Sequence, residues 1–131
     1  MSAHPRVHRE SSPTTARGVS DSVRVGAGDL IFVSGAVARP PGGEIPESFE
    51  AEIDLCFEDL SRALSDANAR FADVVKLNIY IVGLNAERFA AFRQARERWL
   101  DPEHSPASTV VGVSSLVEDR YTIEIEAVAA V

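Results

Sequence analysis

Hydrophobic residues recur every three or four positions in two segments of this chain. Residues 49–67 place apolar side chains on one helical face and charged side chains on the other, which predicts an amphipathic helix with one buried face. Residues 86–100 show a second such pattern, and the Asp101-Pro102 pair predicts its end. The residues expected on the inner side of this second helix are Phe89, Phe92, Ala95, Arg96 and Trp99.

Shorter segments alternate between apolar and polar residues, as β-strands do. Residues 22–29 alternate and then turn through a Gly-x-Gly-Asp sequence into residues 30–37, which predicts a β-hairpin. Further strands are predicted at residues 74–82, 108–113 and 120–130. The expected order of elements is therefore ββαβαββ, an α+β arrangement.

The predicted sheet has more apolar surface than two helices can cover. Two helices shield only one face of a sheet of this size, yet residues 30–33, residues 109–113 and the last strand are apolar on both faces or nearly so. An uncovered apolar face must contact another surface. The simplest solution is self-association, with sheets packed against sheets and the helices outside. The pattern therefore predicts an oligomer.

Charge and composition argue against several classes of partner. The chain of 131 residues has a net charge of −7, and Lys76 is its only lysine. A nucleic-acid partner is not expected, because phosphate binding requires clustered Lys and Arg residues. The arginines at positions 88, 93, 96 and 98 are interpreted as a solvated helix face. No apolar run approaches about 18 residues, so no membrane span is expected.

The N-terminal segment is rich in Ser, Pro, Arg and His and lacks an apolar central region, so it is not expected to be a secretory signal. Residues 1–17 are predicted to form a disordered tail, and residues 18–131 are predicted to form a single domain. A cytoplasmic location is the simplest expectation for such a chain.

No cofactor and no metal are expected. Cys56 is the only cysteine, which excludes an intramolecular disulfide and a cysteine-based zinc site, and the helical pattern around it predicts a small core residue. Gly26 and Gly28 are followed by neither a helical pattern nor a third glycine, so a dinucleotide site is rejected. The His, Asp and Glu residues lack metal-ligand spacing, and no Gly-x-Ser-x-Gly sequence indicates a serine hydrolase.

Four short motifs occur in a defined order along the chain. They are Leu30-Ile-Phe-Val-Ser-Gly35, Asp73-Val-Val-Lys-Leu-Asn-Ile-Tyr80, Pro106-Ala-Ser-Thr109 and Ile123-Glu-Ile-Glu-Ala127. Together, by their order and spacing, they resemble the Rid/YjgF family of enamine and imine deaminases, also called endoribonuclease L-PSP. The resemblance implies a chorismate-mutase-like α+β domain, with helices on one face of a mixed sheet. It also implies a homotrimer that binds small molecules in clefts between its subunits.

Rid/YjgF members with deaminase activity hydrolyse short-lived enamines and imines of 2-amino acids to 2-oxo acids, without metal or cofactor. In these members an arginine after the Pro-Ala pair binds the substrate carboxylate in bidentate fashion, while a carboxylate and backbone groups orient the attacking water. By resemblance, Glu124 matches the water-orienting glutamate and Ser34 matches the serine of a strand-end Ser-Gly pair. Thr109 lies beside the position of the family's arginine.

Three positions depart from the family pattern. Ser108 replaces the arginine, and a short uncharged hydroxyl cannot bind a carboxylate in the same way. Gly18-Val-Ser stands where the family has Gly-Pro-Tyr, and Arg93 stands where some members have an asparagine. The sequence therefore resembles an arginine-less subgroup of the family. The candidate catalytic residues are Glu124 and Ser108, and the candidate substrate-binding residues are Ser34, Arg93 and Thr109.

Two functions are consistent with the sequence. The first is a Rid-type hydrolase of small enamines or imines with altered substrate recognition, for which deamination of 2-aminoacrylate is expected to be weak or absent. The second is a trimeric protein that binds a small metabolite in the same clefts without turnover. Arg93 is correspondingly either the cation that replaces the missing arginine or a solvated helix residue. Endoribonuclease activity is disfavoured by the acidic charge, and His104, close to the Pro-Ala pair, has no visible partner in the sequence.

Overall fold

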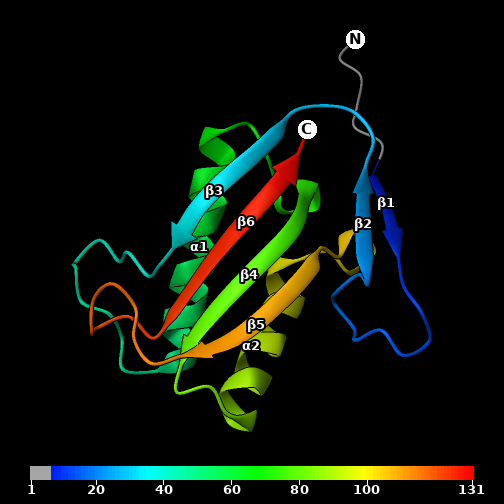
Figure 1. The fold of residues 1–131 in the computed structure, drawn as a ribbon. Helices are drawn as coiled ribbons and strands as arrows, with labels where there is room; N and C mark the ends of the chain where they lie inside the picture. Colours follow the sequence, from blue (N-terminus) through cyan, green and yellow to red (C-terminus); the bar gives the residue numbers. More distant parts are fainter. Residues whose placement is uncertain (1–6) are drawn as a thin grey trace.

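The computed structural model describes residues 7–131 and contains one mixed sheet with two helices on one of its faces (Figure 1). The strands follow the spatial order β3-β6-β4-β5, in which β4 and β5 are parallel and the other neighbours antiparallel. The strands are β3 (Leu30–Ala36), β4 (Val74–Val82), β5 (Ala107–Val113) and β6 (Ile123–Ala130), and the helices are α1 (Phe49–Asp66) and α2 (Ala86–Trp99). The expected α+β fold, with helices on one face of a mixed sheet, is confirmed.

Both helices begin where the sequence supplies a capping side chain. Ser48 precedes α1, and its Oγ accepts a hydrogen bond from a backbone N–H of the first turn at 3.2 Å. Asn85 precedes α2, and its Oδ1 accepts a similar bond at 2.8 Å. After α2, Asp101 caps a short 3-10 helix, Pro102–His104. The predicted end of the second helix is therefore confirmed, because proline cannot continue it.

An aromatic cluster joins the two helices. The ring of Phe57 in α1 stacks against Phe92 and Trp99 of α2, with centroid distances of 6.2 and 5.8 Å, and it meets the edge of Phe71 at 6.0 Å. The indole N–H of Trp99 donates to Asp54 Oδ1 at 2.8 Å, which satisfies its polar atom. Full burial of an apolar side chain of this size contributes roughly 1.5–3 kcal/mol, so this cluster is a major source of stability.

The predicted hairpin of residues 22–29 and 30–37 is not formed. β2 (Ser22–Val25) pairs antiparallel with β1 (Val7–Glu10) in a separate two-stranded sheet, whereas β3 pairs with β6. The hairpin prediction is wrong because β2 pairs with a strand in the segment predicted as a tail, and β3 pairs with the last strand of the chain. A local alternation indicates a strand but does not specify its neighbour.

Part of the segment predicted as a tail has regular structure. Residues 1–6 lie outside the described residues, but β1 lies within the predicted tail. The Arg9 guanidinium of β1 donates to the carbonyl oxygens of Ala72 and Val74 at 3.3 and 3.4 Å, which ties the strand to the start of β4. The structure differs from the expectation here because these partners lie more than sixty residues further along the chain.

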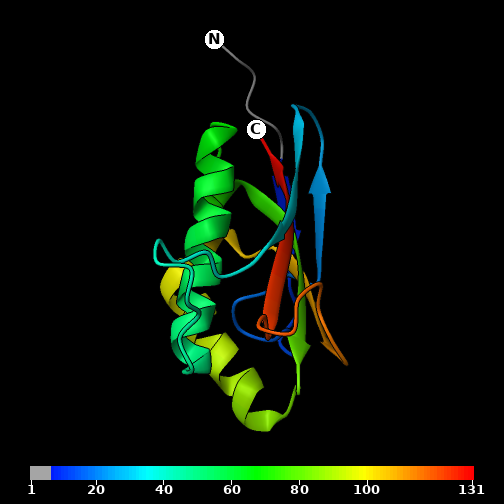
Figure 2. The same cartoon turned by 90° about the vertical axis from the view of Figure 1, so that its left-hand side faces the viewer.

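Both helices lie on one side of the sheet, and no helix covers its other face (Figure 2). This open face is partly apolar. On β3 the side chains of Phe32 and Leu30 are 75% and 51% exposed, and on β5 that of Val111 is 40% exposed. The covered face is buried and consists mainly of Leu77, Ile79, Ile81, Ile123 and Ile125. The described residues thus contain the uncovered apolar face that the sequence predicts.

The outer surface of α2 is charged. Arg93 and Arg98 are exposed, in agreement with the predicted solvated face. Arg96 is buried, and the prediction is wrong for this residue because Arg96 follows the inner helical period together with Ala95. Within residues 7–131, no helix combines the length and the apolar composition that a membrane crossing requires.

Candidate functional site

Two carboxylates lie on the open face of the sheet and have different surroundings. Glu124 and Glu126 of β6 alternate with the buried Ile123 and Ile125, so both point away from the helices. Tyr80 of β4 donates a hydrogen bond to Glu126, and this bond is the main cause that raises the pKa of the Tyr80 hydroxyl. Among the described residues no group donates a hydrogen bond to the Glu124 carboxylate. Glu124 is therefore the carboxylate that can accept a bond from a ligand or water.

A β-bulge in β3 lies beside Glu124. The register between β3 and β6 shifts between Val33 and Ala36, which leaves Ser34 and Gly35 outside the regular ladder. A Cβ atom on Gly35 would lie 2.6 Å from Cδ of Glu124, so only glycine leaves room for the carboxylate here. Two predicted site residues, Ser34 and Glu124, thus lie on neighbouring strands beside the bulge.

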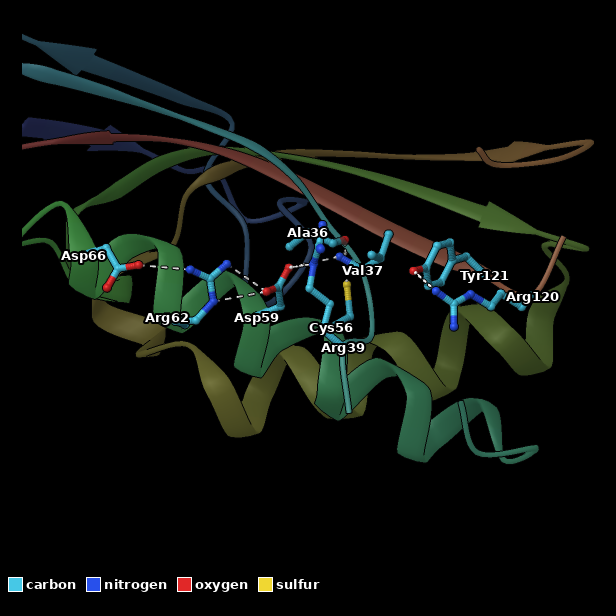
Figure 3. A network of polar contacts seen from close by, with 9 residues as sticks. All are labelled: Ala36, Val37, Arg39, Cys56, Asp59, Arg62, Asp66, Arg120 and Tyr121. Carbon is cyan, nitrogen blue, oxygen red and sulfur yellow. Dashed lines mark hydrogen bonds and ion pairs between the residues drawn. The ribbon is translucent and has the colours of Figure 1, made fainter. Parts of the chain in front are cut away.

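A buried carboxylate of α1 holds the end of β3 from the helix side (Figure 3). The side chain of Asp59 is 6% exposed. Its hydrogen-bond donors are the Val37 N–H at 3.4 Å, Arg39 Nε at 3.2 Å and Arg62 Nη2 at 3.0 Å. Hydrogen bonds to a charged group are about twice as strong as neutral ones. Asp59 therefore fixes the backbone that directly follows the bulge.

Cys56 lies next to this carboxylate in the core (Figure 3). It is fully buried, and its Sγ donates to the carbonyl oxygen of Ala36 at 3.1 Å. Burial, followed by the charges of Asp59 and Glu52, raises the pKa of the Cys56 thiol above its ordinary value of 9.0. The prediction of a small core residue is confirmed, because a buried, protonated thiol is not a nucleophile.

Glu52 of α1 fixes the start of β6 in the same way. Its side chain is almost fully buried, with 3% of the residue exposed. Its oxygens accept hydrogen bonds from the Thr122 N–H at 2.8 Å, the Thr122 hydroxyl at 2.5 Å and the Ile123 N–H at 3.3 Å. These bonds hold the backbone immediately before Glu124. Glu52 is therefore a positioning residue for the candidate catalytic carboxylate.

Thr109 lies on the open face at the edge strand. It is paired with Asn78 in the parallel ladder of β4 and β5, and its Oγ1 accepts a hydrogen bond from Lys76 Nζ at 3.1 Å. The structure thus gathers three predicted residues, Ser34, Thr109 and Glu124, on one face of the sheet. They come from three different strands, so the sheet rather than a loop sets their arrangement.

Ser108 and Arg93, the other two candidates, do not lie on this face. Ser108 is paired with the buried Leu77, so its side chain points to the helix side. Its Oγ is buried and has no hydrogen-bond partner among the described residues. Arg93 is exposed on α2, where its guanidinium lies 5.2 Å from the ring centroid of Phe89. The strand period could have predicted the direction of Ser108, because Ser108 and Thr109 must point to opposite faces.

His104 has a structural partner. Its Nδ1 lies 2.9 Å from Asp101 Oδ2, and Asp101 also accepts a hydrogen bond from the Glu103 N–H at 2.9 Å. These two bonds, with the Glu103 N–H first, lower the pKa of the Asp101 carboxyl. His104 thus belongs to the cap of the short 3-10 helix. In the part of the chain that the structure describes, no three His, Cys, Asp or Glu side chains are arranged to hold a metal ion.

Sequence reasoning missed three residues that shape this region. Glu52 lies four positions before Cys56 and therefore shares the buried face of α1, a signal that its charge obscures. Gly35 stands at a bulge, which the alternation of β3 does not reveal. Arg96 follows the inner period of α2, but its charge and its neighbouring arginines favour a solvated position. In each case the sequence does not show which distant part of the chain the residue contacts.

The chain is similar to known proteins over most of its length. A family model described as endoribonuclease L-PSP matches residues 9–131. The mitochondrial protein mmf2 of Schizosaccharomyces pombe is 33% identical over 108 residues, which are 81% of this chain and 83% of mmf2. The family-model match includes the bulge of β3, the Pro-Ala pair and β6.

Solved structures agree with this similarity. The Rid-family protein YyfB of Yersinia pestis, described as a protein of unknown function, has 28% sequence identity and a TM-score of 0.82, with 95% of this chain and 98% of YyfB covered. TdcF of E. coli, solved with bound serine, has 25% identity and a TM-score of 0.69, with 93% and 91% covered. Sequence and fold therefore point to one and the same family.

Proposed function

The chain belongs to the endoribonuclease L-PSP family, that is, the Rid/YjgF family, and from this membership we propose that it is a small-molecule hydrolase of enamines or imines with altered substrate recognition. The observation that carries the proposal is the environment of Glu124. Its carboxylate has no donor in the described part of the chain and lies over Gly35, while Glu52 fixes the backbone before it. A positioned, unengaged carboxylate is what the activation of a water molecule requires.

The proposed reaction adds water to a carbon–nitrogen double bond. An enamine substrate first takes a proton on carbon and loses one from nitrogen, which gives the imine. Glu124 then accepts a proton from a water molecule while the water oxygen bonds to the imine carbon. Glu124 returns this proton to the nitrogen, and the carbon–nitrogen bond breaks while the new hydroxyl gives up its proton and becomes the carbonyl oxygen, so that ammonia and a 2-oxo compound leave. No redox step and no cofactor enter this balance.

Assembly into a homotrimer is part of the proposal. The exposed Phe32 and Leu30 on the open face support it, because a monomer gains nothing from exposing large apolar side chains there. In such a trimer the small-molecule ligand binds in clefts between subunits, and neither nucleic acid nor membrane is a partner. The proposed location is cytoplasmic, although the relative mmf2 is named as mitochondrial.

A light-scattering experiment tests the assembly. The purified chain is expected to elute from size exclusion at three times the monomer mass, and Phe32→Glu is expected to shift it to the monomer. The matched control is Phe89→Glu, which changes an exposed phenylalanine on the helix side. A wild type that stays monomeric and folded, or a Phe32→Glu variant that stays trimeric, contradicts the proposed trimer through this face.

A turnover experiment tests the chemistry. Release of ammonia and 2-oxo acid is measured from freshly generated 2-aminoacrylate and from longer 2-imino acids. Wild type is expected to be weak on 2-aminoacrylate, and Glu124→Gln is expected to lose whatever turnover is found by about 100-fold, in the range of general-base catalysis. Glu126→Gln, two residues along the same strand, is the matched control. It is expected to retain turnover, because the Glu126 carboxylate is already hydrogen-bonded to Tyr80.

Two outcomes contradict this proposal. If wild type deaminates 2-aminoacrylate as fast as a family member that carries the arginine, the interpretation of Ser108 is wrong. If Glu124→Gln and Glu126→Gln behave alike, Glu124 is not the base. The variant Ser108→Arg completes the set, because restoration of the family residue is expected to raise turnover of carboxylate substrates.

A non-catalytic metabolite-binding protein of the same trimeric fold is the second candidate. The specific observation in its favour is Ser108, which removes the charge that the family's deaminases use for their substrate. A ligand bound at equilibrium and recovered unchanged after prolonged incubation, together with no turnover of any imino acid tested, favours this candidate over the hydrolase.

A further inference from the structure

A cavity of about 520 Å³ lies where both helices begin. Its walls come from the loop of residues 43–47, from the first turns of α1 and α2, and from Arg120 and Thr122 before β6. The loop after β3 and the loop before β6 lie side by side in Figure 1, and Arg120 Nη1 donates to the Gly43 carbonyl at 3.0 Å. Small-molecule sites occupy about 300–1,000 Å³. Because both helices contribute to its walls, this cavity is separate from the open face that carries Glu124.

Arg88 of α2 brings a positive charge to the cavity. Its Nη1 donates to the Val82 carbonyl at 3.0 Å, and its guanidinium lies 4.4 Å from the ring centroid of Phe49 in α1. These two contacts hold the half-buried side chain in place. Within residues 7–131 Arg88 forms no ion pair. Arginine carries five N–H donors, so Arg88 retains donors for an anionic group in the cavity.

Arg120, the other arginine of the lining, is already engaged. Its Nε donates to Glu118 at 3.1 Å and forms an ion pair with it, and its Nη2 donates to the Tyr121 hydroxyl at 2.8 Å. With the bond from Nη1 to Gly43, each nitrogen of this guanidinium has a partner. Arg120 therefore belongs to the wall, and Arg88 is the cation that a ligand can reach.

Three glutamates bring negative charge to the same cavity. Glu52 is almost fully buried and is held by the N–H groups of Thr122 and Ile123. Glu44 and Glu47 are exposed on the loop. In the described part of the chain none of the three forms an ion pair. Charges of both signs thus line one cavity, each held by its own contacts, and they do not neutralise one another directly.

We propose that this cavity binds a free α-amino acid, whose carboxylate pairs with Arg88 and whose ammonium group faces the glutamates. A carboxylate matches the planar guanidinium with two parallel hydrogen bonds. An acid without an amine is repelled by the glutamates, and an amine without a carboxylate leaves Arg88 unmatched. Ile45 and Pro46 add apolar surface to the lining, which suits an apolar side chain. The site is distinct from that of the proposed hydrolase and takes no part in the chemistry at Glu124.

Calorimetric titration of L-valine into the purified full chain tests the proposal. Wild type is expected to bind L-valine, and to bind 3-methylbutanoate and 2-methylpropan-1-amine at least about tenfold more weakly, because each lacks one of the two charges. Arg88→Met removes the cation but keeps an apolar stem over Phe49, and it is expected to weaken binding of L-valine at least about tenfold. The matched control Arg98→Met lies on the same helix outside the cavity lining and is expected to bind as wild type does.

The double variant Glu44→Gln/Glu47→Gln tests the ammonium contact and leaves the buried Glu52 in place. Exposed charges contribute little each, so binding of L-valine is expected to fall about two- to fivefold. The matched control is Glu50→Gln/Glu58→Gln, which changes two exposed glutamates of α1 that do not line the cavity. A loss of the same size in both double variants contradicts a specific ammonium contact.

A second measurement covers the case in which Arg88→Met does not fold. In wild type the backbone amide of Thr122 is followed by NMR and is expected to shift with the calorimetric affinity, while that of Ser34 at the β3 bulge stays unmoved. No binding of L-valine, equal binding of the acid or the amine, unchanged binding by Arg88→Met, or a shift at Ser34 instead of Thr122 each overturns the inference. If L-valine binds through Arg88 but no imino acid is turned over, the inference stands and the proposed hydrolase fails.

Discussion

Buried charges are treated differently in two regions of this molecule. Where α1 meets β3 and β6, the buried carboxylates of Glu52 and Asp59 accept hydrogen bonds from backbone N–H groups and from arginines. Where α2 meets the Gly18 turn and where β5 begins, the buried Arg96 and Ser108 each keep a polar atom without a partner among residues 7–131. The first region holds the open-face strands in place, and the second leaves some of its buried polar atoms without hydrogen bonds. Most buried polar groups in folded proteins are hydrogen-bonded, so the second region is the exceptional one.

The largest effect in this comparison is expected for Glu52→Ala. Its removal leaves the Thr122 and Ile123 N–H groups without acceptors, so unfolding free energy is expected to fall by about 3 kcal/mol. Urea denaturation measures this change. The control is Glu50→Ala in the same helical turn, which is exposed and is expected to change stability by less than about 0.5 kcal/mol. Equal effects of the two variants would remove the contrast between the regions.

A smaller loss is expected for Asp59→Asn. The amide keeps the shape of the side chain but loses the charge that attracts the Arg39 and Arg62 guanidinium groups, so a loss of about 1–2 kcal/mol is expected. Asp66→Asn removes the exposed partner of the same Arg62 and is expected to cost less than about 0.5 kcal/mol. The pair separates the value of a buried carboxylate from that of an exposed one.

Alkaline pH probes the same region through Cys56. Because the pKa of the thiol is raised in the folded protein, its contribution to stability is fully present below pH 9.0 and declines above it, where the unfolded chain loses the proton first. The decline is expected to reach about 1.4 kcal/mol per pH unit. Thermal denaturation of wild type and Cys56→Ala between pH 8 and 10 checks it, since the variant lacks this part of the slope. Parallel curves would contradict the assignment.

The smallest change, and one of opposite sign, is expected for Arg96→Met. Replacement of an unpaired buried charge by an apolar side chain is expected to leave unfolding free energy unchanged or raise it by up to about 1 kcal/mol. Urea denaturation, run beside Glu52→Ala, gives the comparison directly. A loss as large as that of Glu52→Ala would show that Arg96 already has a partner and would erase the difference between the two regions.

The sequence predicts the periodic elements well because their signals are local. The bounds of β4 are those of the predicted strand, residues 74–82, and both helices lie within about one residue of their predictions. The β2–β3 hairpin fails because β2 pairs with β1 in the segment predicted as a tail, and β3 pairs with β6 at the other end of the chain. Alternation likewise suffices to put Glu124 on an exposed face.

The site itself needed tertiary information. The resemblance to the family is enough to show that Ser108 stands where the family has an arginine. That Ser108 is buried beside Leu77 follows only from the register of β4 and β5. The room that Gly35 leaves for Glu124 depends on a bulge, and the burial of Arg96 depends on the Gly18 turn. None of these contacts produces a periodic pattern in the sequence. The sequence therefore could not show which of the arginines of α2 is buried.

The stacking of Trp99 against Phe57 has a practical consequence. Trp99 is the only tryptophan of the chain, and it lies at the seam between the two helices with its indole nitrogen bound to Asp54. Its fluorescence is therefore an intrinsic optical reporter of that seam, one that needs no label. Separation of α2 from α1 would change the emission, even where the sheet itself stayed intact.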